Sequence, residues 1–297
     1  MTKVIVTGGC GFIGHHVVEH LYRNTDWEII ILDKLSYASN GYERLRDIFD
    51  ERDIFTFDTK RVRMYSCDLC NEIPSGLKYE MGDIDYIIHM AAETHVDNSI
   101  TNPKLFIENN VMSTYNVLEF CRNCPTLKRI IHFSTDEVYG PALNGKMFKE
   151  DERHNPTNPY SASKSASEQI CVSYRNTFKV PLIIVNVMNA FGERQHVEKF
   201  IPMCIDKLTK NEPIKIHTYP DGTTPGSRFY VHCRNIASAV LHLIHNGTIG
   251  ENYNIGGTEI DNLSLAKLIA KFMNKSPEFV MIPEDPNRPG HDLRYGL

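Results

Sequence analysis

The sequence predicts an α/β fold: a doubly wound parallel sheet followed by a smaller α/β lobe. The first observation is that short apolar runs alternate with helical patterns over about the first 190 residues. The second is that these runs are continuously apolar, as in strands buried on both faces. The third is that eight prolines punctuate shorter elements beyond that point. We therefore expect a first domain over 1–188 and a lobe over 189–297.

The expected elements follow from these patterns in chain order. The strands are Val4–Thr7, Glu28–Leu32, Val62–Tyr65, Tyr86–Met90, Arg129–Phe133 and Leu182–Val187. The helices are Gly14–Tyr22, the crossover segments Lys104–Cys124 and Tyr160–Phe178, and Ile236–His245 and Leu263–Met273 in the lobe. Strands separated by crossovers of this length form parallel pairs.

Composition excludes several classes of protein. The net charge of −5 gives no reason to expect a nucleic acid or an anionic membrane as partner. No apolar stretch is long enough to span a membrane, and the N-terminus lacks the apolar core of a secretory signal. The eight cysteines are scattered, and the pairs Cys67/Cys70 and Cys121/Cys124 are too far apart for a zinc site. We expect reduced thiols, no metal and a cytoplasmic protein.

A glycine-rich loop follows the first expected strand and opens the first helix. Gly8, Gly11 and Gly14 are spaced three apart, with Phe12 and Ile13 between the last two. Such glycines allow a tight turn, close approach of the backbone to a pyrophosphate and close packing of helix on strand. The helix N-terminus then offers free N–H groups to phosphates. The loop predicts a Rossmann-type dinucleotide site.

An acidic residue at the end of the second strand selects the cofactor. Asp33 follows Glu28–Leu32, where a carboxylate binds the adenosine ribose hydroxyls and repels a 2′-phosphate. This favours NAD over NADP, although the adjacent Lys34 weakens the inference.

Polar residues after the fifth strand and at the start of a later helix predict acid–base chemistry. Thr135, Asp136 and Glu137 follow Arg129–Phe133, where ligands of open α/β sheets bind. Tyr160 and Lys164 are four apart and share a helix face after Pro159. An ammonium near a phenol favours the phenolate, which predicts Tyr160 as a base at neutral pH.

These residues carry a resemblance. The glycine loop, Thr135, Tyr160 and Lys164 resemble the extended short-chain dehydrogenase/reductase superfamily, over essentially the whole chain. Within it, the chain is similar to the nucleotide-sugar 4,6-dehydratases that act on dTDP-glucose or UDP-glucose. The motifs are Ala91-Ala92-Glu93-Thr94-His95-Val96-Asp97, Ser134-Thr135-Asp136-Glu137, Pro159-Tyr160-Ser161-Ala162-Ser163-Lys164, Glu198-Lys199-Phe200-Ile201-Pro202 and Arg288-Pro289-Gly290-His291-Asp292.

The resemblance implies a reaction with NAD as a recycled cofactor. Sugar C4 is oxidised, water is lost across C5–C6, and the hydride returns to C6. It implies that Tyr160 takes the 4-hydroxyl proton, Thr135 bonds the 4-oxygen, Glu137 removes the C5 proton and Asp136 protonates the departing 6-hydroxyl. Two carboxyls in unequal roles need environments that separate their pKa values.

The resemblance also implies binding residues. Toward NAD they are Gly8, Gly11, Phe12, Ile13, Gly14, Asp33, Lys34, Asp68, Leu69, Ala91, Ala92, Tyr160 and Lys164, and toward the sugar nucleotide they are His95, Asn189, Glu198, Lys199, Arg228, Arg288 and His291. The arginines suit bidentate binding of a diphosphate. A homodimer through the helices near 104–124 and 160–178 is implied as well.

Three features depart from that family. Ala190-Phe191-Gly192 follows Asn189 where a second asparagine and a tyrosine are usual, and Pro225-Gly226-Ser227-Arg228-Phe229 replaces the usual stretch around Arg228. The chain stops at Leu297 where relatives continue for a further helix, so it is either naturally short or truncated. The alternatives are a 4-epimerase or decarboxylase on the same scaffold, or a non-catalytic NAD-sensing regulator. Thymidine and uridine differ too little for the sequence to separate them.

Overall fold

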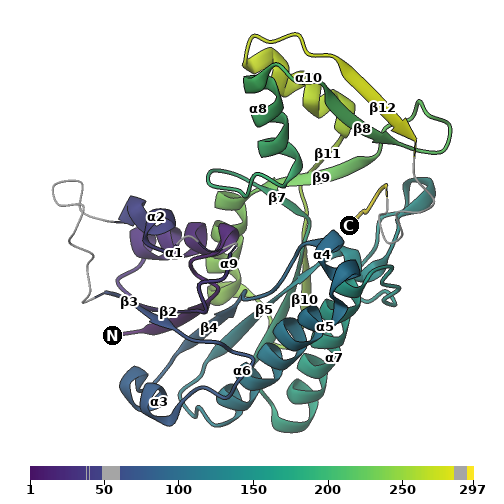
Figure 1. The fold of residues 1–297 in the computed structure, drawn as a ribbon. Helices are drawn as coiled ribbons and strands as arrows, with labels where there is room; N and C mark the ends of the chain where they lie inside the picture. Colours follow the sequence, from purple (N-terminus) through teal and green to yellow (C-terminus); the bar gives the residue numbers. More distant parts are fainter. Residues whose placement is uncertain (38, 40, 49–60, 284–292) are drawn as a thin grey trace.

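A seven-stranded parallel sheet forms the centre of the molecule (Figure 1). The computed structural model describes residues 1–37, 39, 41–48, 61–283 and 293–297. The strand order is β10-β6-β5-β4-β1-β2-β3. In chain order these strands are β1 (Lys3–Thr7), β2 (Glu28–Asp33), β3 (Val62–Ser66), β4 (Tyr86–His89), β5 (Arg129–Thr135), β6 (Leu182–Val187) and β10 (Asn252–Ile255). Each of the six strands expected in the first domain is confirmed to within one or two residues.

Helices cover both faces of this sheet, as its continuously apolar strands require. On one face α1 (Phe12–Asn24) and α9 (Cys233–Asn246) pack against apolar side chains of the strands. On the other face the covering helices are α3 (Ser75–Met81), α6 (Ser113–Arg122) and α7 (Pro159–Phe178). Alternate side chains of each strand point to opposite faces of the sheet and so contribute to two separate hydrophobic cores. The predicted doubly wound fold is confirmed.

The expected helix over 104–124 is not one regular helix. It divides into α5 (Pro103–Phe106), a π-helical segment Ile107–Met112 and α6. The preceding short helix is α4 (Val96–Thr101). The π-helical turn carries Asn109, which accepts a hydrogen bond from the Lys34 ammonium, and Asn110, which accepts the backbone N–H of Glu93. Such turns are frequent at functional sites.

A smaller lobe lies beyond the carboxyl ends of the central strands (Figure 1). One part is a three-stranded sheet of β7 (Asn189–Phe191), β9 (Ser227–His232) and β11 (Thr258–Asp261). The other pairs β8 (Ile214–Thr218) with β12 (Phe279–Pro283) under α8 (Phe200–Lys210) and α10 (Asn262–Phe272). A short helix, α2 (Gly41–Leu45), follows β2.

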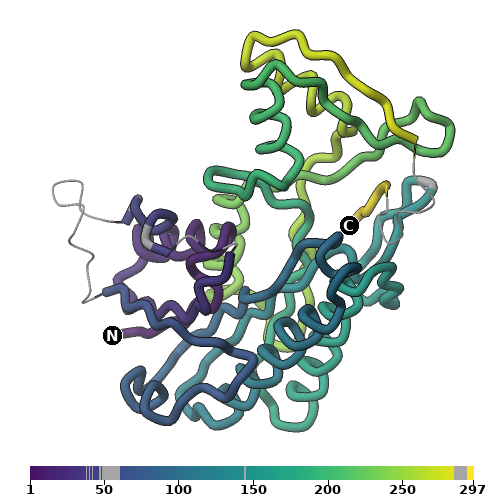
Figure 2. Tube along the Cα trace, in the orientation of Figure 1, coloured from purple at the N-terminus to yellow at the C-terminus, as the bar shows by residue number. Residues whose placement is uncertain are grey.

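The chain crosses between the two parts more than once, as the tube in Figure 2 shows. After β9 it returns to pack α9 on α1 and to add β10 beside β6 at one end of the central sheet. The elements after residue 188 are therefore shared between the lobe and the sheet layer. The expected boundary between a first domain over 1–188 and a lobe over 189–297 therefore stays a prediction. Among the described residues, no helix has the length and apolarity needed to cross a membrane.

Candidate active site

The glycine loop adopts the geometry that a pyrophosphate requires. Gly8 has φ +68°, and a Cβ added at Gly14 would lie 2.1 Å from the carbonyl oxygen of Gly8. Gly11 donates its N–H to the same oxygen over 2.9 Å and is the N-cap of α1, where no side chain bonds the first helical turn. The N–H groups of that turn remain available to an anion. These residues fit the phosphates of a dinucleotide.

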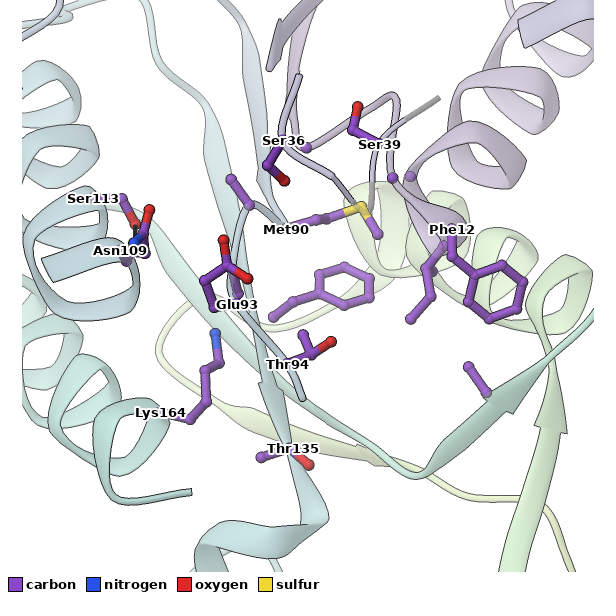
Figure 3. A pocket seen from close by; sticks show the side chains of 18 of the residues that line it. Phe12, Ser36, Ser39, Met90, Glu93, Thr94, Asn109, Ser113, Thr135 and Lys164 are labelled. Atoms are coloured by element: carbon purple, nitrogen blue, oxygen red, sulfur yellow. Dashed lines mark hydrogen bonds between the residues drawn. The ribbon is translucent and has the colours of Figure 1, made fainter. Parts of the chain in front are cut away.

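One cavity of about 330 Å³ joins the glycine loop to the predicted acid–base residues. It is lined at the carboxyl ends of the central strands, where ligands of such sheets bind. The predicted site residues that line it are Gly8, Gly11, Phe12, Ile13, Gly14, Asp33, Lys34, Asp68, Leu69, Ala91, Ala92, Thr135, Asp136, Glu137, Tyr160, Lys164, Asn189, Glu198 and Lys199. Figure 3 shows Thr135, Lys164, Glu93 and Phe12 around the same space.

Two of the predicted sugar-nucleotide residues that the structure describes, His95 and Arg228, are not among those that line this cavity. The imidazole Nε2 of His95 lies 3.6 Å from Glu198 Oε2 and so meets the cavity through that residue. The guanidinium of Arg228 lies over the Tyr295 ring, 5.0 Å from its centroid. Arg288 and His291 lie outside the described residues.

The carboxylate of Asp33 is fixed by the backbone around it. Its Oδ2 accepts the N–H of Cys10 over 3.0 Å, and its Oδ1 accepts the N–H of Leu35 over 2.8 Å. Lys34, the residue that weakened the choice of NAD, points elsewhere. Its ammonium donates to Asn109 and lies 3.4 Å from Glu93 Oε1. A partnered Lys34 has less charge to offer a 2′-phosphate.

Thr135, Asp136 and Glu137 lie where β5 ends and a single 3-10 turn, Asp136–Tyr139, begins. Thr135 caps that turn, since its Oγ1 accepts the N–H of Glu137 over 3.3 Å. The same hydroxyl donates to Asp136 Oδ1 over 3.0 Å. Among the described residues, Asp136 Oδ2 is buried without a hydrogen-bond partner.

The two neighbouring carboxyls have different surroundings. Burial, and then the charge of Glu137, raises the pKa of Asp136 to about 7. Burial also raises the pKa of Glu137, but hydrogen bonds from Asn158 Nδ2, 3.2 Å away, and Tyr295 OH, 3.3 Å away, oppose that rise. Burial thus favours the protonated form of Asp136, whereas two hydrogen bonds partly offset the same effect at Glu137.

Tyr160 and Lys164 share one face of α7, as their spacing predicts, and both are buried. The expected phenolate is not what this environment favours. Burial, with Glu137 next, raises the pKa of Tyr160 above its ordinary value. Burial likewise lowers the pKa of Lys164 to about 8. Helical spacing predicts that the two groups are near each other, but the degree of burial, which spacing does not reveal, dominates both pKa values.

Comparison with known proteins shows the family. Residues 4–256 match the NAD dependent epimerase/dehydratase family. The chain belongs to that family. The dTDP-glucose 4,6-dehydratase of Haemophilus influenzae is 35% identical over 100% of this chain and 90% of its own length.

Solved structures of the family are similar as well. A dTDP-glucose 4,6-dehydratase from Streptomyces venezuelae, solved with NAD bound, has a TM-score of 0.85 and 32% identity over 100% of this chain and 88% of its own. A UDP-glucuronic acid 4-epimerase from Bacillus cereus also has a TM-score of 0.85, at 25% identity over 99% of this chain and 90% of its own. Because both fit equally well, backbone shape in this family does not identify the reaction.

Sequence reasoning about this family member missed three groups around the acid–base cluster. Asn158 caps α7 and bonds Glu137, and an asparagine just before a helix-starting proline could have signalled it. Tyr295 reaches Glu137 from far along the chain, with no local signal. Glu168 is buried behind Lys164 and accepts from Ser134 and Asn186. Its position one turn after Lys164 was the available clue.

Proposed function

We propose that this enzyme is an NAD-dependent nucleotide-glucose 4,6-dehydratase, which converts dTDP-glucose or UDP-glucose to the 4-keto-6-deoxy sugar nucleotide. The observation that carries the proposal is the Asp136–Glu137 pair. Its Asp136 has a buried, unpartnered Oδ2 and a raised pKa, whereas Glu137 has two hydrogen-bond donors on its carboxylate. An acid and a base side by side are what elimination of water across C5–C6 requires.

The proposed cofactor site is the glycine-loop end of the cavity. Gly8, Gly11, Phe12, Ile13 and Gly14 would hold the pyrophosphate, and Asp33 would bind the ribose hydroxyls. Bound NAD supplies the acceptor and donor of the hydride. The further residues proposed to contact it are Lys34, Asp68, Leu69, Ala91, Ala92, Tyr160 and Lys164.

The proposed chemistry at the other end follows from which groups face the cavity. Tyr160 takes the 4-hydroxyl proton, and Thr135 bonds the 4-oxygen. The resulting ketone acidifies the C5 hydrogen, which Glu137 removes. Asp136, the carboxyl better able to hold a proton, protonates the 6-hydroxyl as it departs. Buried Lys164 contributes positive charge near the oxygen that loses its proton.

We propose that the sugar nucleotide extends toward the lobe. Asn189, Glu198 and Lys199 line the cavity there, and His95 contacts Glu198. Arg228, Arg288 and His291 are proposed to contact the nucleotide as well.

We further propose a cytoplasmic homodimer. Several large apolar side chains are exposed on the π-helical turn, α6 and α7: Ile107 is 54% exposed, and Met112, Tyr115 and Phe178 are each 41% exposed. Apolar side chains gathered on adjacent helices favour burial against a second copy. The free cysteines of the described residues fit a reducing compartment.

The test is incubation of the purified enzyme with a panel of nucleotide hexoses. Loss of one water, detected by mass, together with a 4-keto-6-deoxy product, is the expected result. A product of unchanged mass would instead indicate epimerisation, and loss of carbon dioxide from an acidic sugar would indicate decarboxylation. The panel also reveals whether thymidine or uridine is preferred.

A further inference from the structure

Residues 293–297 connect the lobe with the acid–base end of the cavity (Figure 1). On the lobe side, this segment accepts the N–H of Ser227, at the start of β9, over 3.0 Å. On the other side, the carbonyl oxygens of the residues before and after Tyr295 accept the N–H groups of Ala142 and Phe148, each over 3.0 Å. The backbone around Tyr295 is therefore held by both parts of the molecule.

The side chain of Arg294 reinforces this position. Its guanidinium donates to both carboxylate oxygens of Glu259, on β11, over 2.7 and 3.1 Å. It also donates to the carbonyl oxygens of Ala142 and Lys146, each over 2.9 Å. Bidentate contacts of this kind add geometric specificity. The neighbouring Tyr295, which is 4% exposed, is thus buried on a segment with a well-defined position.

The Tyr295 side chain contacts a cation with its ring and the proposed base with its hydroxyl. The hydroxyl donates to Glu137 Oε2 over 3.3 Å. The guanidinium of Arg228, on β9, lies over the ring at 5.0 Å from its centroid and donates to the carbonyl oxygen of Ser227 over 2.8 Å. A cation is attracted to an aromatic ring within about 6 Å. Arg228, Tyr295 and Glu137 therefore form a row that leads from the lobe to the acid–base pair.

A cation over the ring of a phenol strengthens its hydroxyl as a hydrogen-bond donor. The positive charge draws electron density from the ring, so the O–H bond becomes more polar, and interactions linked in this way reinforce one another. A hydrogen bond to a carboxylate favours its ionised form. Arg228 can therefore support the ionised form of Glu137 through Tyr295.

We propose that Arg228 is a positioning residue for the base, an inference that rests on the dehydration proposed above. Through its contact with the ring it keeps Tyr295 in place and strengthens the hydrogen bond from the Tyr295 hydroxyl to Glu137. The base is thereby kept ionised for removal of the C5 proton. Contact with the nucleotide, also proposed for Arg228, is a separate role that concerns binding. Because the stretch around Arg228 departs from the family, its contacts in this chain carry the assignment.

The groups that face Glu137 come from several elements, and their effects on its pKa differ. They are Asp136, Asn158, Tyr160, Lys199, Arg228 and Tyr295. Burial raises the pKa of Glu137, and the hydrogen bond from Asn158, at the start of α7, is the largest opposing contribution. The charge of Arg228 comes next, ahead of the charge of Lys199 and the hydrogen bond from Tyr295. Loss of Arg228 should therefore raise the pKa of the base.

The pH dependence of C5 exchange tests the proposal. The measurement is the rate at which the holoenzyme exchanges the C5 hydrogen of saturating sugar nucleotide with deuterated solvent, followed by mass spectrometry across a pH series. Arg228→Met removes the charge but keeps a long side chain. It should move the acidic limb of this rate upward by about one pH unit, because loss of an opposite charge raises the pKa of a carboxyl. The rate should fall about 10-fold below the pKa of the base and little at pH 8.

Two further arginine variants bound this result. Arg228→Lys keeps a cation that can lie over the ring, so the acidic limb should stay within about 0.3 pH unit of the wild type. Arg234→Met is the matched control, because that arginine is exposed on α9 and pairs with Glu193 over 2.7 Å. It should leave the exchange profile unchanged. Where Arg228→Met fails to fold, Arg228→Gln removes the same charge with a polar side chain.

A double variant tests whether the effect passes through Tyr295. Tyr295→Phe keeps the ring but removes the hydroxyl, so Arg228 can no longer act on Glu137 by that hydrogen bond. Arg228→Met combined with Tyr295→Phe should shift the acidic limb by less than the sum of the two single shifts, because both break one path. Retained NAD and an unchanged melting temperature confirm that each variant is folded.

Three results would overturn the proposal. One is an Arg228→Met variant with the acidic limb of the wild type and a change in KM alone, which would confine Arg228 to the nucleotide. Another is fully additive shifts in the double variant, which would mean that Arg228 acts without Tyr295. The third is an Arg228→Lys variant that shifts the limb as far as Arg228→Met. Failure of the proposed function differs from all three, since the wild type would then yield no 4-keto-6-deoxy product from any nucleotide-glucose.

Discussion

The two ends of the central cavity are built by different means. At the glycine-loop end, the backbone makes the site, and its main requirement is the absence of side-chain atoms at Gly8 and Gly14. At the other end, Asp136, Glu137 and Tyr160 make the site through proton affinities set by burial. Substitutions at the first end should therefore act by steric exclusion, and substitutions at the second end by changing the pH dependence or stopping single steps.

The largest effect is expected at the glycine-loop end. Gly14→Ala should yield protein without bound NAD and without turnover, because the new Cβ would lie 2.1 Å from the Gly8 carbonyl oxygen. The measurement is the NAD released when the purified protein is denatured. Gly76→Ala in α3 is the matched control, since nothing lies within 4 Å of the added Cβ. Retention of NAD by Gly14→Ala would show that α1 can shift to admit the methyl group.

At the acid–base end, Tyr160→Phe should lower kcat by about 10²–10⁴-fold, the usual range for a lost acid–base group. The KM for the sugar nucleotide should change little, since the hydroxyl acts in the transition state. Steady-state kinetics check both values. The comparison variant is Tyr174→Phe. Tyr174 lies on the same helix as Tyr160, and its hydroxyl donates a hydrogen bond to Glu119. Near-normal turnover of Tyr160→Phe would remove Tyr160 from the proton path.

A single step should fail when the base is removed. Glu137→Gln should still pass hydride from C4 to NAD but should lower exchange of the C5 hydrogen with deuterated solvent by about 100-fold. Mass spectrometry of recovered sugar nucleotide measures the exchange. A substrate with fluoride at C6 should rescue Asp136→Asn more than Glu137→Gln, because fluoride needs less help from an acid. The reverse order of rescue would mean that the two roles are exchanged.

A smaller effect is expected on the preference for NAD over NADP when Asp33 is substituted. The wild type should be isolated with NAD and should bind NADP far more weakly, because the Asp33 carboxylate repels a 2′-phosphate. Asp33→Asn should reduce that preference by about 10-fold, as expected for about 1.4 kcal/mol of lost discrimination. Calorimetric titration of cofactor-free protein provides both affinities. Equal affinities in the wild type would show that Lys34 overrides Asp33.

The smallest effect is expected from Tyr295→Phe, which removes one donor to Glu137. That bond lowers the pKa of Glu137, so its loss should raise the pKa and move the acidic limb of kcat to higher pH. A base works only when ionised, so the loss should be greater at pH 6 than at pH 8, and within about 10-fold for one hydrogen bond. The pH profile of kcat is the measurement. An unshifted acidic limb would separate this bond from the base.

The fold could be predicted from the sequence because its signals are local. Continuous apolar runs and the glycine spacing predict the strands and the turn at Gly8, and the structure agrees at each. The crossover over 104–124 is instead divided by a π-helical turn. The seventh strand, β10, was not predicted, since its residues Asn252–Ile255 read as polar and are recruited by pairing with β6. The pairing of β10 with β6 depends on tertiary structure, so the hydrophobic pattern of its residues does not predict it.

The sequence could predict which residues lie together in the candidate site, but it could not predict their pKa values. The spacing of Tyr160 and Lys164 placed them on one face, as observed. The spacing does not reveal burial, which raises the pKa of Tyr160 and acts against the phenolate, because burial depends on what packs over the helix. The role of Tyr160 as a base stays a prediction. The donors to Glu137 show the same limit: Asn158 is signalled by its helix cap, whereas Tyr295 has no neighbour in sequence that points to it.

The contact between Tyr295 and Glu137 also bears on the order in which the protein is made. The two residues are 158 positions apart, and Arg294 beside Tyr295 holds the carbonyl oxygen of Ala142 over 2.9 Å. Domains fold from the N-terminal side as the chain emerges from the ribosome. The strands that carry the glycine loop and the acid–base pair can therefore assemble before residue 295 exists. Glu137 gains this hydrogen bond, which lowers its pKa, only when the segment that carries Tyr295 folds back onto β5.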